Sequence, residues 1–542
     1  MSPHQPPVAS SGAHLALPHL VHSAGDPDLE AIVVHDPRKL RLILISMCTA
    51  LVAVIASVSG LNVAQQQLAA DLGASQNTLL WIINGYTMVL AALLLPVGAI
   101  GDRWGRRTVL LVGLGVFAGA SVAAALATST TLMLLARLVA GAGAAMIMPV
   151  TLSVVTSSFP EDRRANAIGV WAGFAGAGGI LGLFFSAAMV DWFSWRWLFV
   201  MPIALCAIAF ALTVTNVENS REVHEHSFDV LGGVLSAIAI GGIVLAFHEG
   251  PEHGWTEPLT LFGIVAGIAA LAAFVLWELR HPHPLLDVRL FGNRALASGS
   301  MNLFIVFAVM FGLFLVLVQF LQAVLGYSAL RASAGLLPMA ALLMPLSSVA
   351  PRIVVRTGAR NLLIVGTTIV TAGLLWMANV PSIDGGYLSV LPGLLLIGTG
   401  MGLIMTPSTV AITESLPAEK QGVASALNDT VREVGGAIGV ALMGSVLSSG
   451  YRTNMADVAA TLPEELRGPV QSGIGQTLAI APQLGDQAAG VVGAARQAFV
   501  DGWHQSMWVA AGLAILAIVL LVVRGPKDSP AAAAERELVA ID

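Results

Sequence analysis

The chain has 542 residues and a formal net charge of −6, with 56% hydrophobic and only 11% charged residues. A soluble domain carries about 25% charged residues, so this composition excludes an ordinary water-soluble globule. Apolar segments long enough to cross about 30 Å of hydrocarbon recur along the chain, which predicts an all-α polytopic membrane protein.

The first 40 residues are polar and rich in proline and contain no apolar stretch of signal-peptide length, so we expect a disordered cytoplasmic tail there. Beyond this tail, fourteen segments are apolar enough to cross the membrane, and they fall roughly at 41–63, 78–101, 108–127, 131–155, 166–190, 197–216, 230–247, 258–278, 297–320, 332–350, 361–380, 387–412, 422–447 and 504–523. A second short cytoplasmic tail is expected at 526–542.

Lysine and arginine are distributed unevenly among the loops that join these segments. If the N-terminus lies in the cytoplasm, 19 of the 26 Lys and Arg residues fall on the cytoplasmic side and five fall in external loops. This asymmetry follows the positive-inside rule and predicts a plasma-membrane protein with both termini in the cytoplasm. The longest external segment, about 448–502, is either a partly helical hairpin or a flexible loop.

A basic turn joins the second and third predicted spans and carries the residues Gly98, Asp102, Arg103, Gly105, Arg106 and Arg107. Glycine permits close helix approach and a tight reversal, and Asp102 can pair with an arginine or with a facing helix N-terminus. A second copy with Arg356, Gly358 and Arg360 follows 253 residues later, with Val355 in the place of Asp102. Two copies in the same orientation predict two similar halves related by an axis along the membrane normal.

These features resemble the major facilitator superfamily, and in particular its fourteen-helix branch of drug:proton antiporters. The resemblance is carried by the loop at 98–111, the arginine-and-glycine run at 137–149, the sequence WRWLF at 195–199, and the segments 319–338 and 416–439. It implies two six-helix bundles, 41–216 and 297–525, with two additional spans within 217–296 between them. It also implies transport that is driven by a proton gradient, without a bound cofactor or metal.

Two features depart from that branch. In the first span Ser57 stands where the family usually has an acid before Asn62-Val63-Ala64. The fifth span lacks the usual proline, and we expect its small residues to provide the close helix packing: Gly173, Gly176, Gly178, Gly179 and Gly182. The charge of a transported compound therefore stays open.

Four ionisable side chains lie within predicted spans: Arg137, Asp429, Arg432 and Glu433. Such a group costs about 2.5–3.5 kcal/mol at the centre of a membrane helix, so we expect it to face a partner or a cavity. Asp429 and Arg432 are three residues apart and can form a pair within one helix near the cytoplasmic rim. Glu433 then remains unpaired within its helix near the middle of the membrane, where burial favours the neutral carboxyl group.

We therefore predict that Glu433 is the principal proton-coupling residue, with Asp429 as the alternative carrier. A bound cation would favour the ionised carboxylate, so that drug and proton would compete for one site. A buried neutral acid with only a structural role is the other interpretation of Glu433. The resemblance implies a coupling role for Arg137, and a structural hydrogen bond to backbone carbonyls is the alternative there.

Weaker candidates for a substrate site are Trp81, Asn84, Tyr86, Asn302, Gln319 and Gln322, although such side chains also act as interface anchors. The function we predict is proton-coupled export of hydrophobic or cationic drugs, and the alternative is export or import of a lipid or natural metabolite. An intramembrane enzyme is disfavoured because no zincin, nucleophile-elbow or Walker motif is found. We expect a monomer whose partners are a small-molecule substrate, protons and the lipid bilayer, with no nucleic acid.

Overall fold

The computed structural model describes residues 33–220 and 228–526, and that part of the chain contains helices and connecting turns but no β-strand. Fourteen of its helical segments are long and apolar enough to cross a membrane, which confirms the predicted number of spans. The predictions for residues 1–32 and 527–542 lie outside the described residues.

The helices follow one another in the order α2 (Pro37–Leu72), α3 (Gln76–Trp104), α4 (Arg106–Ala125), α5 (Thr130–Ser158), α6 (Glu161–Trp192), α7 (Trp197–Asn216), α8 (Val230–His253), α9 (Pro258–Glu278), α10 (Arg294–Gln319), α11 (Ala329–Ala334), α12 (Leu337–Thr357), α13 (Ala359–Met377), α14 (Gly386–Thr413), α15 (Gln421–Ala460), α16 (Glu464–Ser472), α17 (Ile474–Ile480) and α18 (Ala488–Arg524). Short 3-10 turns lie at Val288–Gly292, Ala418–Lys420 and Ala481–Gln487, and a π-helical turn lies at Phe320–Val324.

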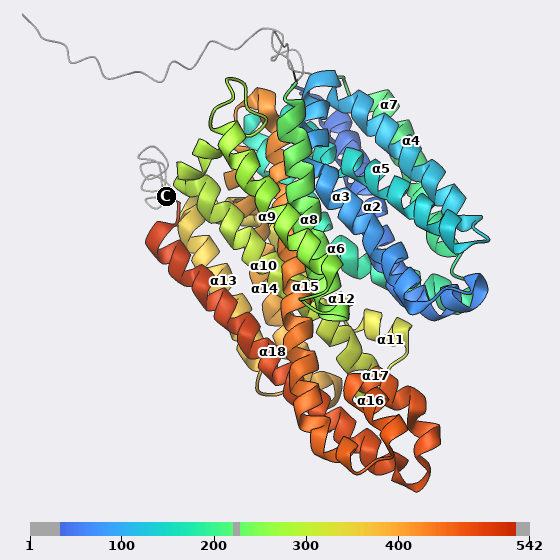
Figure 1. Cartoon of the computed structure of the whole chain (residues 1–542). Coiled ribbons are helices and arrows are strands. Elements are labelled where there is room, and N and C mark those ends of the chain that lie inside the picture. The colour runs from blue at the N-terminus through green and yellow to red at the C-terminus, as the bar shows by residue number, and fades with distance from the viewer. Residues whose placement is uncertain (1–32, 221–227, 527–542) are drawn as a thin grey trace, which may run out of the picture.

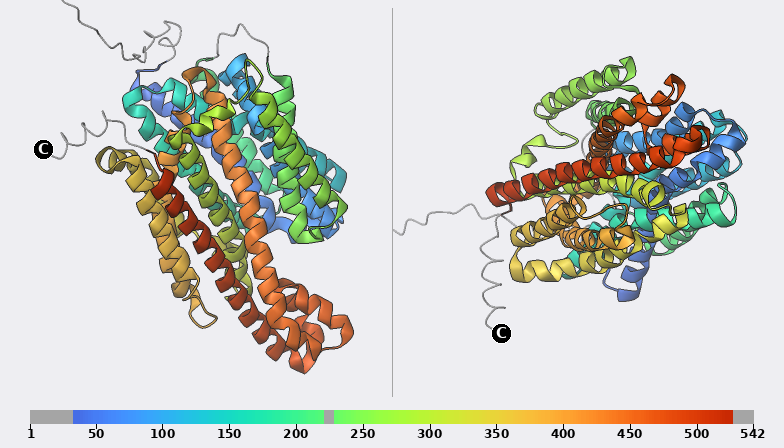
Figure 2. Two further views of the ribbon diagram at one scale, coloured as in Figure 1. Left: turned by 60° about the vertical axis from the view of Figure 1, so that its left-hand side comes forward. Right: turned by 90° about the horizontal axis from the view of Figure 1, so that it is seen from below.

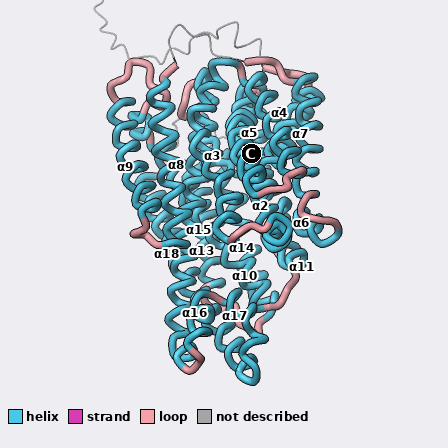
Figure 3. Tube along the Cα trace, turned by 45° about the vertical axis from the view of Figure 1, so that its right-hand side comes forward, coloured by secondary structure: helices cyan, strands magenta, loops and turns pink. Residues whose placement is uncertain are grey.

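The spans form two bundles with a helix pair beside them (Figure 1). Helices α2 to α7 pack together as the first bundle, and α10, α12 to α15 and α18 pack together as the second. Helices α8 and α9 pack on each other, and α8 lies against α3 and α15 (Figure 2). We call the face at which α2 begins and α18 ends the terminal face, and the opposite face, which carries α16 and α17, the distal face (Figure 3).

The two halves repeat the same local construction. Gly105 between α3 and α4 has φ 101°, and Gly358 between α12 and α13 has φ 82°, a region in which a residue with a Cβ would be strained. One helix later, a Cβ on Gly113 would lie 3.1 Å from the carbonyl oxygen of Gly143, and a Cβ on Gly366 would lie 3.0 Å from that of Gly400. The repeat seen in the sequence is therefore a repeat of helix contacts.

The close approach of α4 and α5 at Gly113 gives a first testable prediction. A Cβ there would lie 2.6 Å from Cβ of Met146, whereas a Cβ on Gly115, two residues along the same helix, would meet nothing within 4 Å. We expect Gly113→Ala to destabilise the protein by about 1–3 kcal/mol through overpacking. The control Gly115→Ala should be neutral or slightly stabilising, because alanine is the better helix former. Thermal melting in one detergent checks this, and equal melting temperatures would contradict it.

Helices α2, α15 and α18 extend furthest beyond the predicted spans. Helix α2 begins at Pro37, where the side chain of Asp36 caps it by accepting the N–H of Arg38 at 2.9 Å. Helix α15 continues to Ala460 and α18 already begins at Ala488. Of the two interpretations of segment 448–502, the structure therefore agrees with the partly helical hairpin and not with the flexible loop. A helix satisfies its own backbone hydrogen bonds and need not end where the apolar stretch ends.

Buried apolar contacts hold the distal tip together. Tyr451 of α15 is 2% exposed, and its hydroxyl lies 2.8 Å from that of Thr477 of α17. Met455 of α15 and Val470 of α16 are fully buried as well. The tip is therefore a packed continuation of the second bundle, visible at the lower end of Figure 3.

Candidate functional site

The first copy of the basic turn joins the two bundles at the terminal face. The carboxylate of Asp102 accepts the backbone N–H groups of Gly422 at 2.8 Å and Val423 at 3.1 Å, in the first turn of α15. A helix N-terminus exposes unpaired N–H groups and favours an anion, so Asp102 stabilises this contact. Gly98 permits it, because a Cβ there would lie 2.6 Å from the carbonyl oxygen of Gly422.

Arg106 completes the same contact. Its guanidinium lies 2.8 Å from the carboxylate of Asp102 and also donates to the carbonyl oxygens of Ala418 and Glu419, each at 3.3 Å. Asp102 and Arg106 are only 2% and 4% exposed, so water screens this ion pair little. We call Gly98, Asp102 and Arg106, together with residues 418–423, the gate, after the role that we propose for them below.

The contacts of Arg107 in the first copy and Arg360 in the second copy each stay within one bundle. Arg107 donates to the carbonyl oxygen of Val214 of α7 at 2.7 Å, and Arg103 lies partly exposed in the last turn of α3. In the second copy Val355 and Arg356 are exposed, and Arg360 donates to the carbonyl oxygen of Val522 of α18. The missing acid at position 355 thus coincides with a copy that does not join the bundles.

The linker after α9 ties the additional helix pair to the gate. Lys420 donates to the carbonyl oxygen of Pro284 at 2.8 Å. The fully buried Glu278 at the end of α9 accepts the N–H of Leu286 at 3.3 Å. The α8–α9 pair is therefore connected to the gate end of the second bundle.

The glycine run of α6 packs in two directions. Cβ atoms on Gly173 and Gly176 would lie 3.2 Å from the carbonyl oxygen of Met344 and 2.6 Å from the sulfur of Met405, both in the second bundle. A Cβ on Gly182 would lie 2.6 Å from Cα of Ala56 in α2. Gly178 and Gly179 face α2 as well, at ordinary contact distances.

Asp429 and Arg432 form the ion pair that their spacing predicted. Nη1 of Arg432 lies 3.1 Å from Oδ1 of Asp429, and the amide of Asn428 donates to the same oxygen at 3.3 Å. Asp429 is 0% exposed and Arg432 is 4% exposed. The pair is thus buried between the bundles rather than at a rim in contact with solvent.

Arg432 also links the two bundles. Its Nη2 donates to the carbonyl oxygen of Ala175 of α6 at 3.3 Å, and its guanidinium lies 4.5 Å from the ring of Phe307 and 5.6 Å from that of Trp171. Trp171 is itself fixed by a hydrogen bond from its indole to the hydroxyl of Thr151 at 3.1 Å. Our sequence reasoning missed Phe307 and Trp171; an isolated tryptophan in a glycine-rich helix was the available signal.

Glu433 differs from Asp429 and Arg432 because it has no partner within the described residues. It is partly exposed and makes no hydrogen bond or ion pair within the described residues. It lies within electrostatic reach of Asp429, Arg432 and, in the first bundle, Tyr86. An unpaired, partly buried carboxyl group held between two bundles can take up a proton or hold a cation.

Arg137 lies in the interior of the first bundle, 1% exposed, with neutral partners. Its guanidinium donates to the hydroxyl of Ser57 at 3.0 Å, to the carbonyl oxygen of Ser57 at 3.4 Å and to that of Ile82 at 3.3 Å. It also lies 4.0 Å from the ring of Tyr86, whose hydroxyl donates to the carbonyl oxygen of Val54. The residue that departs from the family pattern, Ser57, is therefore the direct partner of Arg137.

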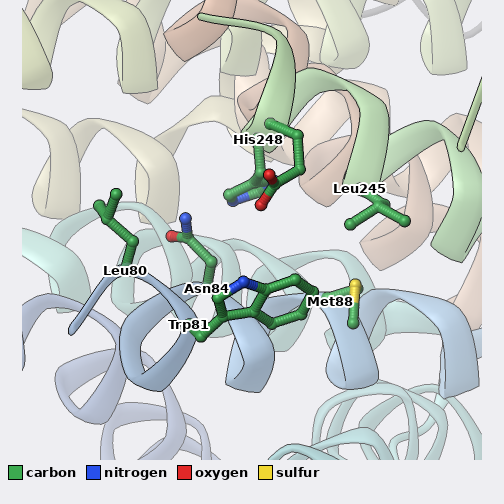
Figure 4. Close-up of a pocket in the computed structure, with 7 residues that line it drawn as sticks. Leu80, Trp81, Asn84, Met88, Leu245 and His248 are labelled. Atoms are coloured by element: carbon green, nitrogen blue, oxygen red, sulfur yellow. The ribbon is translucent and has the colours of Figure 1, made fainter. Parts of the chain in front are cut away.

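The weaker substrate candidates do not gather in one place. Trp81 and Asn84 of α3 line a small pocket with His248 and Glu249 of α8, shown in Figure 4. Its cavity volume is about 10 Å³, room for about one water molecule and far below the roughly 300 Å³ of a drug-binding pocket.

The other candidates lie elsewhere. The buried amide of Asn302 is held within the second bundle by the hydroxyls of Ser408 at 3.5 Å and Thr367 at 3.3 Å. Gln319 and Gln322 are exposed near the distal end of α10. Tyr86, as described above, belongs to the Arg137 cluster.

The WRW motif has a local role at the distal face. The indole of Trp195 donates to the carboxylate of Asp71 at 2.8 Å, and Arg196 pairs with the same oxygen at 3.1 Å. These contacts lower the pKa of the Asp71 carboxyl. They fasten the end of α2 to the start of α7.

Comparisons with known proteins agree with this architecture. The chain is 32% identical over 389 residues to the multidrug resistance protein Stp of Mycobacterium tuberculosis, which covers 72% of each protein. It is 32% identical over 462 residues to the multidrug efflux pump LfrA of Mycolicibacterium smegmatis, covering 84% of this chain and 90% of LfrA. Over 423 residues it is 33% identical to the cephamycin export protein CmcT of Amycolatopsis lactamdurans, covering 77% of this chain and 87% of CmcT.

Solved structures show the same fold at low sequence identity. The human organic anion transporter MFSD10 superposes with a TM-score of 0.58 at 12% identity, covering 90% of this chain and all of that one. The proton:xylose symporter XylE gives a TM-score of 0.56 at 13% identity, covering 91% of this chain and 97% of XylE. The family model described as Major Facilitator Superfamily matches residues 45–440. With its fourteen spans, its two bundles and relatives that are drug efflux pumps, the chain belongs to the major facilitator superfamily of transporters.

Proposed function

We propose that this transporter exports hydrophobic, including cationic, small molecules in exchange for protons, and that Glu433 carries the coupled proton. The observation that supports this most is the contrast, within about one turn of α15, between a paired and an unpaired carboxyl group. Asp429 and Arg432 neutralise each other, whereas Glu433 is partly buried and makes no hydrogen bond or ion pair within the described residues. Membership of a transporter family also sets aside the intramembrane enzyme considered from the sequence.

The competition between substrate and proton follows from charge. A carboxyl group in a poorly hydrated site favours its neutral form, and a neighbouring cation favours the ionised form. A cationic substrate beside Glu433 therefore expels the proton, and a proton on Glu433 weakens binding of the substrate. Exchange of one for the other across the membrane is antiport.

The terminal face is the cytoplasmic side in this proposal. The basic residues of the gate and of the loops beside it, Arg106 and Arg107 among them, lie on that face, as the positive-inside rule requires. With the gate closed there, the conformation described is the one in which the cytoplasmic path is shut. Opening of the gate would give Glu433 access to the cytoplasm.

The names of the relatives support export of small molecules without fixing one compound. They include a cephamycin export protein, a puromycin resistance protein and a tetracenomycin C resistance and export protein, besides multidrug pumps. These compounds differ in structure, so the substrate of this chain is left to experiment.

The test is ethidium transport in inside-out membrane vesicles under an imposed pH gradient. We expect uptake that requires an acidic lumen and stops when a protonophore collapses the gradient. Movement of ethidium that is indifferent to the gradient would contradict proton coupling. Absence of ethidium movement, with gradient-driven movement of a lipid or metabolite instead, would select the alternative substrate class.

A further inference from the structure

A stripe of buried polar residues runs along one face of α15. Ser425, Asn428, Asp429 and Arg432 are spaced i, i+3, i+4 and i+7, which places them on the same side of a helix. The first three are 0% exposed and Arg432 is 4% exposed. We call these four residues the polar stripe.

The polar stripe carries hydrogen-bonding atoms without protein partners. Oγ of Ser425, Oδ1 of Asn428 and Oδ2 of Asp429 are buried and make no hydrogen bond within the described residues. Buried polar atoms are nearly always paired with protein or water, and polar side chains in membrane spans face one another or a water-filled cavity. Oγ1 of Thr430 is also unpaired, but that residue lies on the opposite side of the helix.

The polar stripe connects the gate with Glu433. It begins at Ser425, less than one turn beyond Gly422, whose N–H bonds Asp102. Glu433 follows eight residues after Ser425, about 12 Å along the helix axis. In the closed gate, α3 packs against this end of α15, since a Cβ on Gly98 would lie 2.6 Å from Cβ of Ala426. This contact holds the two bundles together at the gate end of the polar stripe.

We propose that the polar stripe lines the water-filled path through which Glu433 exchanges its proton with the terminal face once the gate opens. The inference rests on the proposed function, because it takes Glu433 as the proton carrier. When α15 separates from α3, the unpaired oxygens of Ser425, Asn428 and Asp429 hydrogen-bond water. The O–H bond of the Glu433 carboxyl then breaks, the proton passes to a water molecule of this chain, and a carboxylate is left behind.

Cysteine accessibility tests the path directly. The two native cysteines, Cys48 and Cys206, are free and buried, and their replacement by alanine gives a background for single cysteines. Ser425→Cys and Asn428→Cys are compared with Thr430→Cys, which stands on the same turn but off the polar stripe. Each is treated in inside-out vesicles with the membrane-impermeant thiol reagent MTSET, with and without the gate-opening substitution Asp102→Asn.

We expect labelling at 425 and 428 that Asp102→Asn accelerates by about tenfold, and no acceleration at 430. Failure of 425 and 428 to label in the open-gate background, or equal labelling at 430, would overturn the proposed path. These outcomes do not depend on ethidium transport. If gradient-driven transport survived Glu433→Gln while the labelling pattern held, the proposed proton carrier would fail and the hydrated stripe would stand.

A second measurement covers variants that fold poorly. Asn428→Leu keeps the branched shape of the side chain but removes its acceptor oxygen, together with the amide that donates to Asp429, and Thr430→Val is its control. We expect Asn428→Leu to slow proton release from the purified protein several-fold while ethidium affinity stays unchanged. An unchanged proton release rate would contradict the path.

Discussion

Replacing Glu433 by glutamine is expected to reduce gradient-driven ethidium transport to the rate of vesicles without the protein. Glutamine keeps the shape of the side chain but cannot ionise, so it can neither release a proton nor compete for a cation. Because Glu433 makes no hydrogen bond or ion pair within the described residues, the melting temperature of the Glu433→Gln variant should differ little from that of the wild type. Ethidium transport and thermal melting, measured on the same preparation, test the expected loss of transport and the expected unchanged stability.

Asp429→Asn is the matched comparison for this experiment. Asp429 is fully buried and paired with Arg432, and removal of one partner of a buried pair costs about 3–5 kcal/mol. We expect this variant to lose thermal stability. Ethidium transport by the protein that does fold should still depend on the proton gradient. If instead Asp429→Asn uncoupled transport and Glu433→Gln did not, Asp429 would be the proton carrier.

The second large effect is expected at the gate. Asp102→Asn removes the charge that accepts two N–H groups of α15 and pairs with Arg106. Hydrogen bonds to charged groups contribute about 1.5–3 kcal/mol, so the ratio of closed to open gate should fall by about tenfold or more. Spin labels at Trp104, which is 66% exposed, and at Ala418 report the separation across the gate.

The equivalent position of the second copy provides the control for the gate. Val355 is 51% exposed and does not join the bundles, so Val355→Asn should leave the distance distribution between the two labels unchanged. A distribution that Asp102→Asn does not alter, or that both substitutions alter equally, would contradict the assignment of the gate to the first copy.

Features that depend on local pattern were predictable from the sequence. Apolar stretches gave the fourteen spans, and helix spacing gave the Asp429–Arg432 pair. The glycine and arginine pattern indicated a basic turn with a special role for Asp102, although its partners, the N–H groups of Gly422 and Val423, lie more than 300 residues away.

Features that depend on how distant helices meet were not predictable. The contacts of Arg137 with Ser57 and of Arg432 with the carbonyl oxygen of Ala175 join residues 80 and 257 positions apart. The sequence of one chain carries no signal for such pairs. The ends of α15 and α18 were also missed, because a helix that leaves the membrane loses its apolar pattern while its backbone hydrogen bonds continue.

Proton release on substrate binding tests the competition at Glu433 most directly. Ethidium is added to the purified protein in weakly buffered detergent solution at a pH near neutrality, and a pH indicator records released protons. We predict release by the wild-type protein and none by Glu433→Gln, with ethidium still bound by both. Equal proton release by the two proteins, or ethidium binding without release in the wild type, would contradict the account.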